Sequence, residues 1–133
     1  MLVEHARNLM GIENAVHAEY GLEGTAIVDA LACSLVETEI TVDLAPGSRL
    51  AGIHGEASVV ERTNCNYGLN PEFAHIADAK GLRVSARDDT GEVRAIERTD
   101  HPFFVGTLYQ PQRTTSTRAP HPLLVAFVRA AIA

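Results

Sequence analysis

The chain has 133 residues, of which 46% are hydrophobic and 21% are charged, and its formal net charge is −6. These values are typical of one globular domain and exclude a wholly disordered chain. The negative charge argues against nucleic acid as a partner, because phosphate binding needs clustered Lys and Arg. No secretory signal or run of roughly 20 apolar residues is present, so we expect no membrane partner. A cytoplasmic protein with reduced thiols, and no disulfide between Cys33 and Cys65, is therefore expected.

Apolar residues at near-helical spacing predict a helix over residues 2–17. Residues 25–44 predict an extended strand, because ETEITVDL alternates polar and apolar side chains. A turn at Pro-Gly-Ser (46–48) and a short helical turn over 49–55 lead to a strand over 57–64. The first half of the chain is thus one helix followed by two strands.

A helix is predicted over residues 70–79, with Asn70 as its N-cap, Pro71 at its first position and Gly81 after its end. Residues 82–89 and 92–98 predict a hairpin around a Thr-Gly turn. Residues 101–109 predict the next strand, and residues 121–133 predict an apolar helix that needs a large packing surface. This mixture of elements indicates an α/β domain, with the polar loop 112–120 beyond a strand end, where such domains often bind ligands.

Four segments carry a resemblance to a known family. They are VEHARNLMGIENA (3–15), ERTNCNYGLN (61–70), KGLRVSA (80–86) and HPFFVGTLYQPQ (101–112), the last followed by HPLLVAFVRAA (121–131). In this order they resemble the glutaminase domain of CTP synthase, a class I glutamine amidotransferase. The resemblance implies one domain over residues 1–133. Its fold would be the second half of a flavodoxin-like, doubly wound, three-layer α/β domain, with the first strands and the nucleophile elbow absent.

The resemblance also implies a chemistry that the sequence departs from. The family hydrolyses glutamine with a Cys nucleophile, a His and a Glu, and the His and Glu positions hold Gln110 and Gln112 here. A Gln side chain cannot take a proton at neutral pH, and loss of a general base costs about 10²–10⁴ in rate. The triad is therefore predicted to be degenerate.

The family's substrate-binding segment is changed as well. Arg62 remains, whereas Asn64 and Cys65 stand among positions where the family has alternating arginines and histidines, and Tyr67 follows them. Asn cannot replace a bidentate guanidinium. Arg62, Asn64, Cys65 and Tyr67 are the expected substrate-segment residues, with Cys65 either a reactive thiol or a small buried hydrophobe.

Three functions remain open. The chain is a degenerate binding or scaffold module without a cofactor, taking a small-molecule ligand. Alternatively, it is part of a glutamine-hydrolysing CTP synthase-type enzyme of pyrimidine nucleotide synthesis, completed by an upstream segment or a partner. The third reading is a truncated product that aggregates. We expect a second copy of the chain or a partner chain to cover the incomplete sheet, unless the coding frame starts further upstream.

The remaining polar residues suggest no site. The six histidines lack metal-ligand spacing, so no metal is expected. His5, His17, His54 and His75 are predicted at the surface or at caps, and His101 and His121, each before a Pro, in positional roles. Cys33 is predicted in the core and Asp88-Asp89 in a turn. Arg87, Arg94 and Arg98 are predicted to form a solvated face of the strands that carry them.

Overall fold

The computed structural model describes residues 1–21 and 23–133. In chain order its elements are α1 (Leu2–Leu9), β1 (Ala15–His17), η1 (Ala18–Tyr20), β2 (Thr25–Leu44), α2 (Arg49–His54), β3 (Ser58–Leu69), η2 (Pro71–Asp78), β4 (Leu82–Asp88), β5 (Val93–Arg98), β6 (Val105–Thr107), η3 (Pro111–Arg113) and α3 (Pro122–Ile132). Here η marks a 3-10 helix. No helix among the described residues is long and apolar enough to cross a bilayer.

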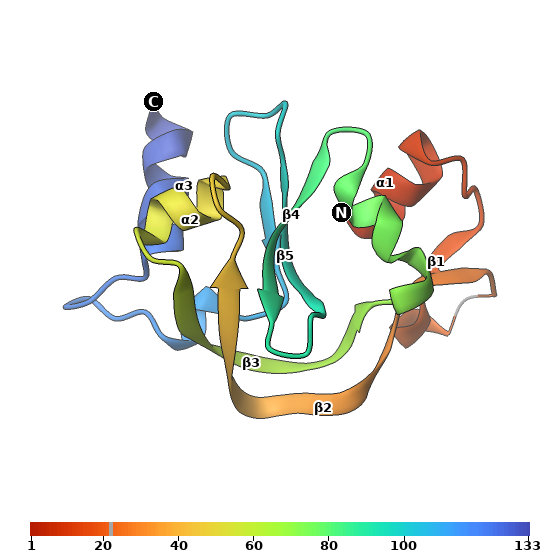
Figure 1. The fold of residues 1–133 in the computed structure, drawn as a ribbon, viewed down its shortest axis with the longest axis horizontal. Helices are drawn as coiled ribbons and strands as arrows, with labels where there is room; N and C mark the ends of the chain where they lie inside the picture. Colours follow the sequence, from red (N-terminus) through yellow and green to blue (C-terminus); the bar gives the residue numbers. More distant parts are fainter. Residues whose placement is uncertain (22) are drawn as a thin grey trace.

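The strands form one six-stranded sheet in the order β1-β2-β4-β5-β6, with β3 paired to β2. In Figure 1, β2 and β3 are long curved ribbons that run along the bottom of the molecule and join its two ends. The helices α2 and α3 lie at one end, α1 and β1 lie at the other, and β4 and β5 lie between them. The concave side of the curved sheet therefore faces the middle of the molecule.

The mixed α/β class is confirmed, but the expectation of a doubly wound parallel sheet is wrong for these strands. Among the described strands only β1 and β2 pair in parallel, and the other four pairings are antiparallel. β4 and β5 are joined by a tight turn, which antiparallel neighbours allow and parallel neighbours do not.

The long ladder of β2 and β3 bends near its middle. Its register shifts between Ala30 and Leu35 and again between Leu35 and Thr38. Glu37, in the second shift, has a φ of 50°, which L residues rarely adopt. Extra residues of this kind bend a strand and increase its twist. Because of this bend, the same pair of strands reaches both ends of the molecule.

The core of the described residues is divided into three clusters. One cluster joins α2, α3 and the ends of β2, β4 and β5 around Leu44, Leu50, Tyr109 and Leu123. A second cluster lies between α1, β1, the start of β2 and η2, around Ala6 and Ile27. A third, around Leu82 and Ile96, lies between η2, β4 and β5.

The first helix is shorter than predicted. Gly11 has a left-handed φ of 72°, and the Ile12 N–H bonds back to the Ala6 carbonyl at 3.0 Å, as in a Schellman-type helix end. Residues 15–17 then form β1 instead of continuing the helix. The Asn70 cap is confirmed, since its side chain accepts the Glu72 N–H at 3.1 Å.

Two further elements differ from expectation. Of the predicted strand 101–109, only Val105–Thr107 pairs in the sheet. The apolar helix α3 buries Leu123 in its first turn, while Phe127, Val128 and Ile132 stay 55–80% exposed. The large packing surface expected for α3 is therefore not formed by the described residues.

Candidate functional site

The expected substrate segment lies on β3, whose alternation separates its side chains onto two faces. Thr63 is fully buried and Cys65 and Tyr67 are half-buried on the inner face, whereas Arg62 and Asn64 are exposed on the outer face. This alternation follows from the two-residue period of a strand. The four expected substrate residues therefore form two separate groups rather than one pocket.

Gln110 follows β6 and lies against β3. Its backbone N–H donates to the Arg62 carbonyl at 2.9 Å, and its side-chain oxygen accepts the Asn64 N–H at 2.7 Å. Its side-chain nitrogen donates to the Leu108 carbonyl at 3.1 Å. Both ends of the amide are thus bonded to backbone groups. Gln110 acts here as a bridge between two segments.

Gln112 is not part of this bridge. It lies in η3, is exposed, and its side chain makes no hydrogen bond within residues 1–21 and 23–133. The neighbouring Arg113 instead pairs with Glu37, at the bend of β2, with a 2.6 Å contact. Arg62 pairs with Glu39 at 3.3 Å, and both side chains are more than half exposed. Exposed pairs of this kind contribute at most about 1 kcal/mol.

Part of the inner face of β3 lines a cavity of about 270 Å³. Cys65 and Tyr67 contribute to its wall together with His17, Leu108 and Arg94. The remaining lining is mainly apolar and comes from residues 1–3, 28, 68–69, 93, 95–96 and 106–107. Tyr67 and His17 stack at a tilt, with ring centroids 5.4 Å apart. The cavity suits a small, largely apolar group.

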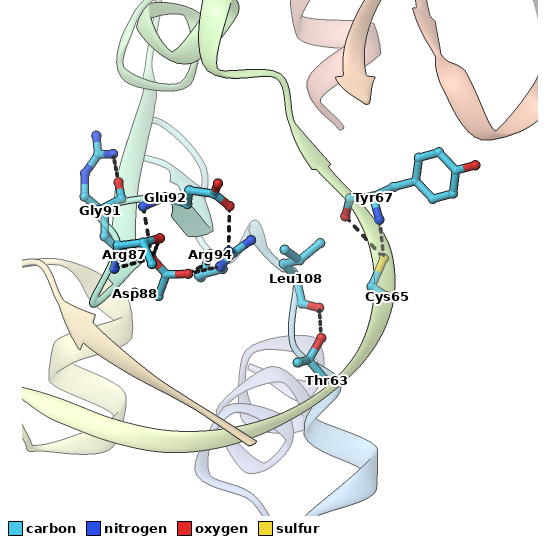
Figure 2. Close-up of polar contacts among 10 residues, drawn as sticks. Thr63, Cys65, Tyr67, Arg87, Asp88, Gly91, Glu92, Arg94 and Leu108 are labelled. Carbon is cyan, nitrogen blue, oxygen red and sulfur yellow. Dashed lines mark hydrogen bonds and ion pairs between the residues drawn. The ribbon is translucent and has the colours of Figure 1, made fainter. Parts of the chain in front are cut away.

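The Cys65 thiol is held by its own strand. Its Sγ donates to the Tyr67 carbonyl at 3.3 Å and accepts the Tyr67 N–H at 3.5 Å, as Figure 2 shows. No imidazole or carboxylate of the described residues bonds to this sulfur. A thiol that donates its proton to a carbonyl lacks the base that would activate it as a nucleophile. Cys33, predicted in the core, is exposed, and both thiols are free.

A buried ion cluster lies beside the cavity (Figure 2). Arg94, only 4% exposed, bonds to Asp88 through Nε at 2.7 Å and to Glu92 at 2.6 Å. Burial would raise the pKa of Asp88, but hydrogen bonds from Thr90 and Arg94 and the Arg94 charge outweigh burial and lower it. The prediction of a solvated arginine face is therefore wrong for Arg94. Asp88 does start the predicted turn, accepting the N–H groups of Thr90 and Glu92.

A second buried polar cluster, which the sequence did not predict, contains His54, Glu61 and His121. His121 Nε2 lies 2.7 Å from Glu61 Oε1, and the His54 and His121 rings meet edge-on with centroids 5.4 Å apart. Burial and the neighbouring His121 lower the pKa of His54, although Glu56 opposes them. Burial and the Glu61 charge raise the pKa of Tyr109, whose ring packs beside this cluster.

The roles predicted for the histidines are met in part. His121 caps α3 by accepting the Leu123 N–H, and His17 caps η1 by accepting the Glu19 N–H. His75 is exposed, as expected. His5 was expected at the surface but is buried, with 5% of its surface exposed. No local spacing could have placed His54 beside Glu61 and His121, because they come from three different elements.

The comparisons with known proteins agree on one relationship. No family model matches the sequence. CTP synthases from Caulobacter sp. (strain K31) and Phenylobacterium zucineum are each 31% identical over 98% of this chain. The glutaminase domain of the Trypanosoma brucei CTP synthase, solved with bound acivicin, superposes with a TM-score of 0.90 and 25% identity. That superposition covers 98% of this chain and 55% of the solved one.

The curved sheet and its helices match the glutaminase domain of a CTP synthase, a class I glutamine amidotransferase domain. Over nearly its whole length the chain is homologous to the glutaminase region of CTP synthases. The chain spans about a quarter of the length of these curated relatives, 27% of each.

Proposed function

We propose that this chain is a glutaminase-type module that does not hydrolyse glutamine and acts through binding. The observation that carries the proposal is the Gln110 amide, which bonds to Asn64 and Leu108 and offers no titratable group. The resemblance puts the family's histidine at this position. A neutral amide that bridges two segments fits a structural role rather than proton transfer.

The thiol nearest to this position supports the same proposal. Amide hydrolysis by a thiol needs an adjacent base to form the thiolate and an acid to protonate the leaving group. Cys65 lies one residue beyond Asn64, but its side chain is on the opposite face of β3 and, among the residues that the structure describes, bonds to Tyr67 alone. Gln110 and Cys65 therefore do not form a nucleophile and base pair.

The cavity beside Cys65 and Tyr67 is the binding surface that fits such a module. Its lining is mainly apolar, and the Arg94 guanidinium in its wall is already paired with Asp88 and Glu92. A zwitterionic amino acid needs free charged partners, which these pairs do not offer. We expect a small, largely apolar molecule or side chain as the ligand, and no cofactor.

Amide shift mapping by NMR tests this loss of the glutamine site. The uniformly ¹⁵N-labelled chain is titrated with glutamine and, separately, with acivicin, each to millimolar concentration. We expect no shifts at the amides of Arg62, Asn64 and Gln110. Saturable shifts concentrated at these three amides would contradict the proposal, and a Tyr67→Ala variant would then show whether the cavity takes part.

A second candidate function is supported by one edge of the sheet. β6 pairs with β5 and with no other described strand, so its second edge is open. An open edge is a template for another strand. In this candidate, a further segment or a partner pairs with β6 and supplies a nucleophile, giving a glutamine-hydrolysing CTP synthase-type enzyme. A second copy of this chain is the third way to cover the edge.

Native mass spectrometry of the protein from its own source separates these cases. A mass of 14.3 kDa alone supports the binding module. Twice that mass indicates self-association. A larger species that releases ammonia from glutamine supports the completed enzyme, and the nucleophile is then sought in the added sequence.

A further inference from the structure

The polar cluster of His54, Glu61 and His121 lies at the end of the molecule that carries α2 and α3 (Figure 1). His54 is the last residue of α2, Glu61 lies in β3, and His121 is the N-cap of α3. One possible ligand atom from each residue lies within 4.8 Å of the other two. Three elements thus converge on one small volume.

Several buried atoms in this volume lack a hydrogen bond. The Glu61 side chain is 3% exposed, yet only its Oε1 has a partner, and Oε2 has none within the described chain. The same holds for His54 Nε2 and for the Tyr109 hydroxyl. A buried carboxylate oxygen without a partner is costly, and native proteins rarely keep one without an ion or a water molecule. These atoms therefore leave a place for a ligand, and the unpartnered carboxylate oxygen of Glu61 favours one of positive charge.

The ligand atoms are close to the spacing of a metal site. Zinc binds His nitrogen at about 2.0–2.1 Å and carboxylate oxygen at about 2.0–2.2 Å, so tetrahedral ligands lie about 3.4 Å apart. In this protein the possible ligand atoms lie up to 4.8 Å apart, and small side-chain rotations would bring them to this spacing. The 2.7 Å contact between His121 and Glu61 opens slightly as the ion enters between them.

His121 needs one adjustment. Its Nδ1 accepts the Leu123 N–H at 3.2 Å, so its proton lies on Nε2 and points to Glu61 in the metal-free protein. Coordination through Nε2 moves this proton to Nδ1 and turns the ring away from the Leu123 N–H. The imidazole stays neutral and keeps one proton, so no other group must take one up. The cost is one long hydrogen bond.

We propose that His54, Glu61 and His121 bind a zinc ion, with a fourth coordination position open to solvent. Two imidazoles and one carboxylate favour zinc over Mg²⁺ and Ca²⁺, which prefer oxygen ligands alone. A cavity of about 380 Å³ borders all three residues, with Glu56, Val60 and Thr114 also in its wall. A water molecule or a small anion in this cavity fits the fourth position. An open position of this kind distinguishes catalytic and ligand-binding zinc sites from closed structural ones.

Zinc titration of the tag-free, chelator-treated chain tests the site, with competition against a chromophoric chelator as the readout. We expect one zinc ion per chain. His54→Leu and Glu61→Gln should each weaken binding at least about tenfold, since loss of even an outer-shell partner costs 10–100-fold. His75→Leu is the matched control, because this histidine is exposed in η2 and belongs neither to the cluster nor to the lining of its cavity. The zinc affinity of the His75→Leu variant should equal that of the wild type.

Two further measurements keep the test independent of folding defects. Glu61→Gln preserves the shape of the side chain, and circular dichroism confirms the fold of each variant. Cobalt(II) added to the wild-type chain should give the visible absorption of a four- or five-coordinate ion, which His54→Leu abolishes. The proposal is overturned by zinc binding that His54→Leu and Glu61→Gln leave unchanged, by an equal loss in His75→Leu, or by no binding at all.

Discussion

The side-chain oxygen of Gln110 accepts a hydrogen bond from the backbone N–H of Asn64 at 2.7 Å, across 46 residues of sequence. The same amide donates to the Leu108 carbonyl, and the Gln110 N–H donates to Arg62. The segment after β6 is thereby fixed to β3 by its side chain as well as its backbone. The family that this chain resembles has a histidine, which can carry a proton, at this position. Here Gln110 joins two segments of the chain instead.

Replacing Gln110 by alanine should destabilise the chain modestly. The substitution removes two hydrogen bonds, but Asn64 is exposed, so water can satisfy its N–H. We expect a loss of about 1 kcal/mol in the free energy of unfolding. Gln112→Ala is the matched control and should change it by less than about 0.5 kcal/mol, because Gln112 is exposed. Urea unfolding curves give both values, and equal effects of the two substitutions would contradict the bridging role of Gln110.

Replacing Arg94 by methionine should be far more disruptive. Asp88, 7% exposed, would lose its cationic partner while still buried, and a buried pair broken on one side costs about 3–5 kcal/mol. Arg62→Met is the control, because its pair with Glu39 is exposed, and it should cost less than about 1 kcal/mol. Thermal and urea unfolding of the two variants decide the question. An Arg94→Met protein as stable as Arg62→Met would show that the buried cluster adds no stability.

His5 should make stability depend on pH near neutrality. Burial and the Arg98 charge lower the pKa of His5 below 6.5, more than the carbonyls of Ala79 and Ile76 raise it. Below pH 6.5, His5 binds a proton in the unfolded chain. In the folded chain it stays unprotonated until the pH reaches its lower, folded pKa. The free energy of unfolding should therefore fall as the pH drops from about 6.5 through the folded pKa.

The variant His5→Leu should remove this part of the pH dependence. Urea unfolding at pH 7.5 and 5.5 measures it, and the difference between the two pH values should be smaller in His5→Leu than in the wild type. His75→Leu, which changes an exposed histidine, should keep the wild-type difference. An unchanged difference in His5→Leu would show that another group titrates instead.

Two glycines should respond to alanine in opposite directions. Gly24 has a φ of 152°, and an added Cβ would lie 2.3 Å from the backbone oxygen of Asn14, so Gly24→Ala should destabilise the chain. Gly52 lies inside α2, and apart from its chain neighbours and the backbone of its own helix, no described atom lies within 4 Å of such a Cβ. Gly52→Ala should stabilise the chain by about 0.5–1 kcal/mol, because alanine favours a helix over glycine. Melting temperatures of the two variants check both signs.

Local patterns in the sequence predicted the elements but not their partners. The alternation in 25–44, the Asn70-Pro71 helix start and the Thr-Gly turn were each sufficient to predict β2, η2 and the β4–β5 hairpin. Gly11 ends α1 early because its left-handed φ stops the helix. This glycine is visible in the sequence, but the apolar spacing beyond it led to the prediction of a longer helix. The doubly wound arrangement was implied by the resemblance alone, and the antiparallel pairing of β2 with β3 and β4 is a tertiary contact that residue spacing does not contain.

The contacts within the candidate sites were even harder to predict from the sequence than the strand pairings. Gln110 and Arg62 were singled out by position, and the structure does place their backbones in contact at 2.9 Å. The burial of Arg94 depends on its contacts with Asp88 and Glu92, and the approach of His54 to His121 depends on the packing of α2 against α3. Such contacts depend on tertiary packing, which residue spacing along one element does not contain.

Ammonia release from glutamine is the measurement that tests the central proposal most directly. The purified chain is incubated with millimolar glutamine, and ammonia is followed with an enzyme-coupled assay, beside Cys65→Ala and a sample without protein. We predict that the wild type, Cys65→Ala and the blank release ammonia at the same rate. Turnover by the wild type that Cys65→Ala abolishes would show an active glutaminase and would contradict the proposal.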